Sequence, residues 1–294
     1  MQFRTDLALE SAQNIPEKTE GISQSCEEYG SIKFYTVDVT TPQAAKTLGK
    51  PQGRYITAEI PPLSDNAEQS DTDILETAKK LRKLLPADGT VLVAGLGNTQ
   101  ITPDALGPLT AEGVLATRHI TGELARSCGM ENLRGAAVIS PGVMGQTGIE
   151  SEEIISAIVK SISPCAVIAV DALAARNTAR LGCTVQLGSS GIAPGAGVHN
   201  ARRALCKETL GLPVIAVGIP TVVDAASLAS DLLYGNNDAD PNVKALFEPR
   251  GSKMIVTPRE IDLIIERGSR FLAAVINCAL QPQLSLDEIK YLMA

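Results

Sequence analysis

Two aspartates that follow short apolar runs are the strongest candidates for chemistry in this sequence. Asp104 stands in the segment TPDALGP, soon after the run at residues 90–94, and Asp171 directly follows the run at 166–170. Ligands bind beyond the carboxyl ends of strands in open parallel sheets, so we expect both carboxylates on one rim. Neighbouring carboxylates can share a proton, and then one activates water while the other donates a proton. The pattern indicates peptide-bond hydrolysis without a metal or a nucleophilic side chain.

Each aspartate also has a purely structural interpretation. Asp104 could cap a helix that starts after Pro103, and Asp171 could bond loop amides at a strand end. Spacing alone favours these interpretations for each residue taken singly.

The glycine-rich segment after the first apolar run is expected to support the site. Gly95, Gly97 and Asn98 would shape the rim and offer amide donors to a developing oxyanion. The third glycine of a dinucleotide fingerprint is missing, because Gln100 stands in its place. The sequence also contains no phosphate-binding G-x-x-x-x-G-K-[ST] motif and no G-x-S-x-G nucleophile elbow.

Other polar residues fit chemistry less well. The six cysteines include no C-x-x-C pair and only two histidines occur, so we predict free thiols and no zinc cage. We expect His119 to be structural or exposed, whereas His199, in a glycine-rich loop, could approach the site. Asp224 is expected to cap the helix that follows it.

Bulk properties exclude several classes of protein. The 294 residues are 44% hydrophobic with a net charge of -7, which disfavours a nucleic-acid binder. The N-terminus has no apolar signal region, and no apolar run reaches the roughly 20 residues of a membrane helix. We therefore expect a cytoplasmic protein without membrane or direct nucleic-acid contacts.

The apolar patterning predicts an α/β fold with a mostly parallel sheet flanked by helices. Continuous apolar runs, typical of buried parallel strands, occur at 90–94, 136–139, 166–170 and 214–217. Helical spacing occurs at 71–85, 109–125, 152–161, 223–233 and 258–279, with Asp71 or Asp73 capping the first of these helices. Alternating segments at 32–39 and 54–60 predict additional N-terminal strands.

The expected domain organisation is simple. Residues 1–30 are polar and predict an N-terminal arm with at most one short helix. Residues 31–294 predict a single α/β domain with a polar insertion near 235–250.

A series of segments resembles the germination protease family. In order, they are GLGN, TPDALGP, TRH, SPGVMGQTGIES, AVDALAAR, GIAPGAGVHNARR and KETLGLPVIAVGIPTVVDA. The resemblance implies an endopeptidase of the spore core that degrades small acid-soluble spore proteins at germination. It implies an atypical aspartic mechanism with Asp104 and Asp171 as the essential pair, no cofactor, and a homotetramer. The family also implies a zymogen, but here only Met1-Gln2-Phe3 precede the RTDLALE segment, so a propeptide would be very short or missing.

The stretch from GLGN to Asp104 is also similar to the GxGN…D motif of hydrogenase maturation peptidases. That similarity implies a shared phosphorylase/hydrolase-like α/β fold. It leaves two alternatives open, a metal-assisted peptidase in which rim carboxylates hold a divalent ion, and a non-catalytic binding relative of the same fold.

Overall fold

The computed structural model describes residues 5–13, 15–16, 19–65, 70–127, 130–195, 203–234 and 254–293. His199 and the polar insertion near 235–250 lie outside these residues. The α-helices are α1 (Ala8–Ala12), α2 (Pro42–Leu48), α3 (Asp71–Arg82), α4 (Leu106–Glu112), α5 (Gly122–Ser127), α6 (Met144–Thr147), α7 (Ser151–Ile162), α8 (Lys207–Leu210), α9 (Ala225–Tyr234), α11 (Ile261–Leu280) and α12 (Leu286–Met293). The described residues also form the 3-10 turns η1 (Thr102–Asp104) and η2 (Thr178–Arg180).

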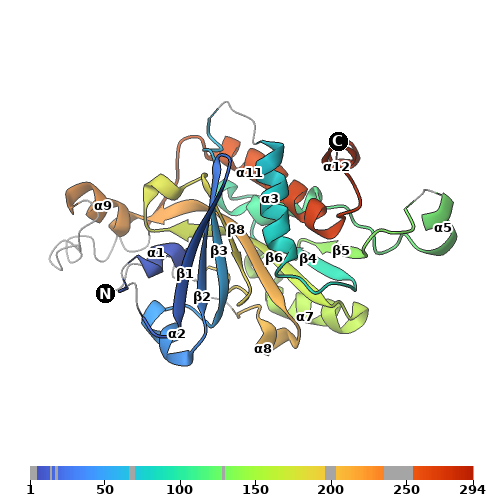
Figure 1. Ribbon diagram of the computed structural model, residues 1–294, viewed down its shortest axis with the longest axis horizontal. Coiled ribbons are helices and arrows are strands. Elements are labelled where there is room, and N and C mark those ends of the chain that lie inside the picture. Colours follow the sequence, from blue (N-terminus) through green and yellow to red (C-terminus); the bar gives the residue numbers. More distant parts are fainter. Residues whose placement is uncertain are drawn as a thin grey trace.

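The strands of the described residues form one nine-stranded sheet (Figure 1). They are β1 (Ile22–Tyr29), β2 (Ile32–Val39), β3 (Gly53–Glu59), β4 (Val91–Gly95), β5 (Ala136–Ile139), β6 (Ala166–Ala175), β7 (Thr184–Gly188), β8 (Val214–Asp224) and β9 (Ile255–Val256). The order is β1-β2-β3-β7-β8-β6-β4-β5, with β9 paired to β8. Strands β8, β6, β4 and β5 run parallel, whereas β1, β2, β3 and β7 extend the sheet with antiparallel pairs.

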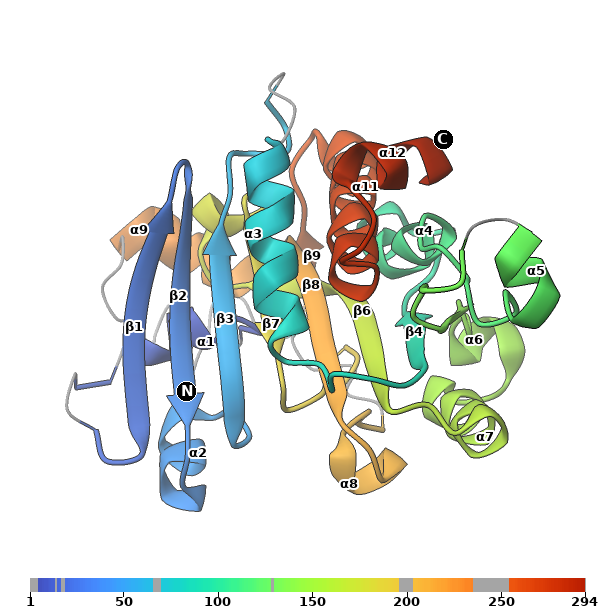
Figure 2. The ribbon, with the colours of Figure 1, turned by 45° about the vertical axis from the view of Figure 1, so that its right-hand side comes forward.

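Helices cover both faces of the sheet, because its strands are apolar on both sides. Figure 2 shows α3 and α11 side by side in front of the sheet and α1 behind it. Alternate residues of β4 separate accordingly: Val91 and Val93 join the core under α3 and α11, while Leu92 and Ala94 join a second core with α7. This arrangement confirms the predicted α/β class with helices flanking the sheet and extra N-terminal strands.

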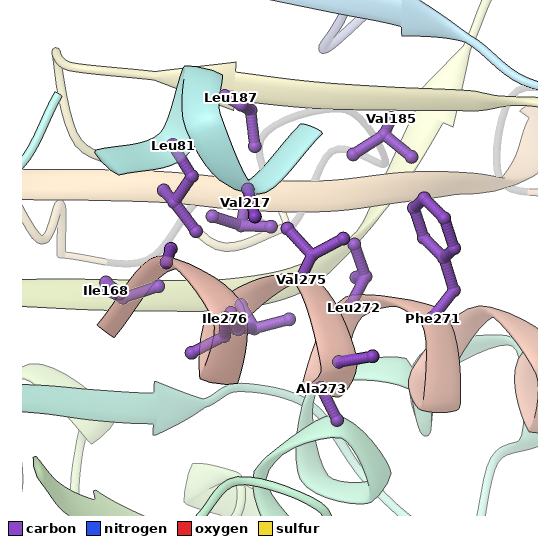
Figure 3. Packing of buried hydrophobic residues seen from close by; sticks show 14 of the residues in the cluster. Leu81, Ile168, Val185, Leu187, Val217, Phe271, Leu272, Ala273, Val275 and Ile276 are labelled. Atoms are coloured by element: carbon purple, nitrogen blue, oxygen red, sulfur yellow. The ribbon is translucent and has the colours of Figure 1, made fainter. Parts of the chain in front are cut away.

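The main core lies between α11 and the centre of the sheet. Figure 3 shows Phe271, Leu272 and Val275 of α11 directed toward Val185 and other residues of the central strands. The long helix predicted at 258–279 is thus confirmed, because its apolar stripe packs on the sheet as helical spacing requires.

Part of the segment predicted as an N-terminal arm, residues 1–30, belongs to the sheet. Residues 22–29 form strand β1, which pairs antiparallel with β2 through a tight turn at Gly30, where φ is +60°. Most of β1 is exposed and polar, so it lacks the apolar alternation that identified β2 and β3. The edge position allows this composition, and its Glu27 forms an ion pair of 2.7 Å with Lys80 of α3.

The helix predicted at 109–125 is also wrong in extent, because the structure divides it. Helix α4 ends at Glu112, and α5 begins only at Gly122. The buried side chain of Asn277 in α11 ends α4, since it donates to the carbonyl oxygen of Gly113 at 2.9 Å and accepts from the N–H of Leu115 at 2.9 Å. A tertiary contact therefore overrides an apolar period that continues along the sequence.

Several strand boundaries and one cap also differ from the predictions. Strands β6 and β8 continue well beyond 170 and 217, and β7 and β9 were not predicted. Helix α3 is capped by Ser70, which forms a reciprocal capping box with Asp73, rather than by Asp71 or Asp73.

Among the described residues, no helix is both long and apolar enough to cross a bilayer.

Candidate active site

Asp171 lies within β6 rather than at its end, which corrects its expected place. Strand β4 ends at Gly95, opposite Val170, whereas β6 and β8 continue as a pair, with Asp171 opposite Gly218. Asp171 is therefore the first residue of β6 beyond the end of β4. Because the strand continues through it, the backbone fixes the direction of its side chain.

Asp104 is held at the end of β4 by its backbone. It closes the 3-10 turn η1, where its N–H donates to the carbonyl oxygen of Ile101 at 2.8 Å. Its own carbonyl oxygen accepts the N–H of Asn98 at 3.1 Å. From β8, the hydroxyl of Thr221 donates to the carbonyl oxygen of Pro103 at 2.8 Å. These bonds fix η1 from the preceding loop and from the sheet.

The structure departs from both structural interpretations of the two aspartates. The N-cap residue of α4 is Ala105, so Asp104 does not occupy the N-cap position of this helix. The Oδ1 of Asp171 accepts the N–H of Ala172 at 2.9 Å, which is a local contact within β6 and not a loop anchor.

Close backbone packing explains the glycines of the rim. Gly97 has φ of +119°, and a Cβ there would lie 2.0 Å from the carbonyl oxygen of Asp104. A Cβ on Gly95 would lie 2.2 Å from the carbonyl oxygen of Gly107, and one on Gly107 would lie 2.2 Å from that of Leu96. The start of α4 can therefore lie directly against the ends of β4 and β6.

Asn98 supports the rim through bonds that were not foreseen. Its N–H is engaged by Asp104, so this amide is not free for the oxyanion role considered above. Its Oδ1 accepts from the N–H of Gln100 at 3.0 Å and from the Nε2 of Gln146 at 2.8 Å. Asn98 thus ties the loop after β4 to α6.

Asp104 and Asp171 line the same pocket, which has a volume of about 230 Å³. Apolar side chains form most of its wall: Leu96, Ile101, Val143, Leu173, Ile192 and Ile255. Such a wall lowers the local dielectric, which strengthens the interaction between charges inside the pocket. The structure thus brings together two aspartates that are 67 residues apart in the sequence, 171 minus 104.

The environment of Asp171 favours its neutral form. Its side chain is buried, and this burial raises the pKa well above 3.8, with the negative charges of Asp104 and Asp6 adding to the shift. Asp171 therefore retains its proton at a pH at which an exposed aspartate is ionised.

A third carboxylate, Asp6, was missed by the sequence analysis. It lines the same pocket, and its Oδ2 accepts the N–H of Ala174 at 2.8 Å. Its pKa is raised by burial, while the ammonium group of Lys50 opposes the shift. The apolar residues after Asp6 form only a short run, so only the pair of acidic residues in RTDLALE could have indicated a polar anchor.

The second acidic residue of that segment, Glu10, fixes it to the sheet. Its buried carboxylate accepts the N–H groups of Arg176 at 2.8 Å and Asn177 at 2.9 Å, just beyond the end of β6. The side chain of Arg180 lies 3.6 Å from the same carboxylate. A buried carboxylate with these partners holds α1 in place.

Other described residues considered from the sequence do not line this pocket. His119 is exposed, and Asp224 caps α9 by accepting the N–H of Ser227 at 3.0 Å, which confirms the predicted cap. The cysteines within the described residues are free. Over the same part of the chain, no three His, Cys, Asp or Glu side chains are grouped closely enough to hold a metal ion.

We expect Gly97→Ala to destabilise the protein by about 2–4 kcal/mol, because it combines backbone strain with a clash against Asp104. The free energy of unfolding in urea measures this effect. Gly145→Ala is the matched control, since a Cβ at Gly145 meets no atom within 4 Å. Equal stability of the two variants would show that the close contact at Gly97 does not hold η1.

Replacing Asp171 by Asn should change how stability depends on pH. A raised pKa in the folded state gives stability that is complete below the unfolded pKa, near 3.8, and is lost as pH rises through the folded pKa. Asp171→Asn has no titrating group at this position and does not lose stability in this way. Its free energy of unfolding, relative to that of the wild type, should therefore rise by up to about 1.4 kcal/mol per pH unit above pH 4. Urea unfolding from pH 4 to 8 measures it, and parallel curves for the two proteins would contradict the raised pKa.

Comparison with known proteins identifies relatives over almost the whole chain. A family model for germination proteases matches residues 4–234. Germination protease of Clostridium tetani is 39% identical over 319 aligned residues, which cover 98% of each chain. The enzyme of Clostridium acetobutylicum is 39% identical with 97% of each chain covered, and that of Bacillus velezensis is 35% identical with 97% of this chain and 95% of its own covered.

Among solved structures, the [NiFe] hydrogenase maturation protease HycI from Thermococcus kodakarensis KOD1 aligns with a TM-score of 0.37 and 17% sequence identity. The alignment covers 67% of this chain and 98% of that protein. The match of the family model and the identity to relatives over nearly their full length show that this chain belongs to the germination protease family.

Proposed function

We propose that this protein is the endopeptidase that starts the degradation of small acid-soluble spore proteins at germination, with Asp104 and Asp171 as its catalytic pair. Membership of the germination protease family supports protease activity for this protein. The observation that carries the mechanism is the pair of carboxylates in one apolar pocket, of which Asp171 is buried and has a raised pKa. The resemblance in the TPDALGP and AVDALAAR segments selects the same two residues.

The two aspartates divide the chemistry according to their surroundings. Asp171 retains its proton, and Asp104, which is partly exposed, acts as the base. As water attacks the substrate carbonyl carbon, Asp104 accepts a proton from the water. Asp171 donates its proton to the leaving amide nitrogen, and the C–N bond breaks. The proton on Asp104 then restores Asp171 for the next cycle.

The backbone of the rim supports this division of roles. Thr221 and Asn98 hold η1, so Asp104 cannot move away from Asp171 to relieve the repulsion between them. The apolar wall and the burial of Asp171 reduce the screening of the pair by water. The packing around η1 and the pocket thus both positions the two aspartates and allows them to share a proton.

The family resemblance carries three further parts of the proposal. We place the protein in the spore core, with a homotetramer as its assembly and small acid-soluble proteins as its substrates. Removal of a short N-terminal propeptide would fall close to the catalytic pocket, because Asp6 lines it. The division into an arm at 1–30 and a domain at 31–294 stays a prediction.

Asp104→Asn and Asp171→Asn should each lower kcat by at least about 100-fold, because each removes one partner in proton transfer. Gel analysis of a purified small acid-soluble protein incubated with each variant measures the cleavage. Asp88→Asn, which changes an exposed aspartate outside the pocket, is the matched control and should retain full activity. Turnover like that of the wild type in either pocket variant would remove the mechanism.

The same assay with a chelator distinguishes the metal-assisted alternative. We expect cleavage to continue in EDTA, since the two carboxylates supply both proton-transfer roles. Activity lost in EDTA and restored by one divalent ion would favour a metal. Binding of the spore protein without any cleavage would instead favour the non-catalytic relative.

A further inference from the structure

Strands β6 and β8 pair irregularly beside the catalytic pocket. Leu173 of β6 lies opposite Pro220, but the next residue of β6 lies opposite Val222. Thr221 is therefore an extra residue of β8, left without a partner in the register with β6, and forms a β-bulge. Bulges are rare between parallel strands, and next to active sites they change the direction of a side chain.

The hydroxyl of Thr221 contacts the turn that carries Asp104. It donates to the carbonyl oxygen of Pro103, the middle residue of η1, at 2.8 Å. Proline has no N–H, so this carbonyl oxygen is the one main-chain group that can bond η1 to the sheet at that residue. Thr221 is buried, so the bond forms in a low dielectric, where it is stronger than in water.

The main chain of Thr221 is held from outside the pair of β6 and β8. A bulged residue leaves the ladder, so its main-chain groups need other partners. The carbonyl oxygen of Thr221 accepts the hydroxyl of Thr257 at 2.8 Å. Thr257 directly follows β9, the short strand that pairs with β8 just after the bulge and whose Ile255 lines the pocket. The chain at β9 thus supports the bulge as well as the wall of the pocket.

These bonds differ from the bonds that Asp104 makes itself. The N–H and carbonyl groups of Asp104 bond to Ile101 and Asn98, which lie in the same loop. Such bonds shape the loop but do not fix its place relative to β6. Thr221 instead belongs to β8, which pairs with β6 at Asp171, so its bond relates the position of η1 to that of the second aspartate.

We propose that Thr257 and Thr221 are a relay of positioning residues, in which Thr257 fixes the bulge and the bulge holds η1, and with it Asp104, beside β6. The proposal rests on the proposed function and deepens it, because it names the groups that place the base. Without the hydroxyl of Thr221, the carbonyl oxygen of Pro103 loses its partner, and η1 can move outward to reach water. A shift of about 1 Å can lower the rate roughly 100-fold.

Kinetics with a peptide from a small acid-soluble protein test the bond between Thr221 and η1. Thr221→Val removes the hydroxyl at nearly constant volume, so we expect kcat to fall about 10- to 100-fold and KM to change less than about threefold. Thr221→Ser keeps the hydroxyl and should keep most of kcat. Thr77→Val is the control, because buried Thr77 also donates to a main-chain carbonyl oxygen, that of Asp73 at 2.7 Å, but lies outside the pocket.

A double-mutant cycle tests the bond between Thr257 and the bulge. Thr257→Val should lower kcat about 3- to 10-fold, whereas Thr257→Ser, which keeps the hydroxyl, should not. Because Thr257 acts through Thr221, adding Thr257→Val to Thr221→Val should lower kcat by less than about twofold more. Effects that multiply in the double variant would show independent contributions and overturn the relay.

Titration of the Asp171 carboxyl group by ¹³C NMR distinguishes positioning from a general loss of stability. Burial raises the pKa of Asp171 most, and the negative charges of Asp104 and Asp6 add to the shift. When η1 moves outward in Thr221→Val, the contribution of Asp104 decreases, so the pKa of Asp171 should fall below that of the wild type. The pKa should keep its wild-type value in Thr221→Ser and Thr77→Val.

An unchanged pKa of Asp171 in Thr221→Val overturns the proposal, even if urea unfolding shows this variant to be less stable, and so does a wild-type kcat. Equal impairment of Thr221→Ser and Thr221→Val also overturns it. If Thr221→Val does not fold, Thr257→Val takes its place under the same criteria. If the wild type cleaves no such peptide, the proposed function fails, and the titration alone then decides about the relay: a lowered pKa supports it and an unchanged pKa overturns it.

Discussion

The burial of Asp171 beside a second carboxyl group in one apolar pocket is the constraint on which the rest of the site depends. Asp171 is buried, and its pKa is raised first by this burial and then by the charges of Asp104 and Asp6. An arrangement of this kind is unfavourable for folding, so the surrounding structure must hold it in place. Three features hold this arrangement. They are the pairing of β6 with β8 past the end of β4, the hydrogen bonds of η1, and the close packing at Gly95, Gly97 and Gly107.

The mixed sheet explains how residues of the catalytic pocket and of a second pocket, which shares Asp6 and Leu173 with it, come together. The parallel strands β4 and β6 end at different levels, and this difference leaves Asp171 uncovered by β4. The antiparallel strand β7 lies on the other side of β8 and presents Gln186 on the same face. The parallel part of the sheet thus supplies Asp171, and the antiparallel part supplies Gln186, which lines the second pocket.

Much of this arrangement could be predicted from the sequence, because the buried strands are continuous apolar runs and their carboxyl ends identify the rim. Asp104 and Asp171 were found in this way. The continuation of β6 through Asp171 could not be predicted, because a carboxyl group that follows an apolar run is typical of a strand end. Strand β1 has no apolar period, and the role of Asn277 in ending α4 depends on a contact 164 residues away. Asp6 and Gln186 were missed for the same reason, because their partners exist only in the folded chain.

The most direct test of the account is the titration of the Asp171 carboxyl group by ¹³C NMR of aspartate-labelled protein, with the signal assigned by its loss in Asp171→Asn. We predict that Asp171 in the wild type titrates well above 3.8. We also predict that its pKa falls in Asp104→Asn, because one of the neighbouring negative charges is removed. Titration of Asp171 near 3.8, unchanged by the substitution at Asp104, would contradict a shared proton.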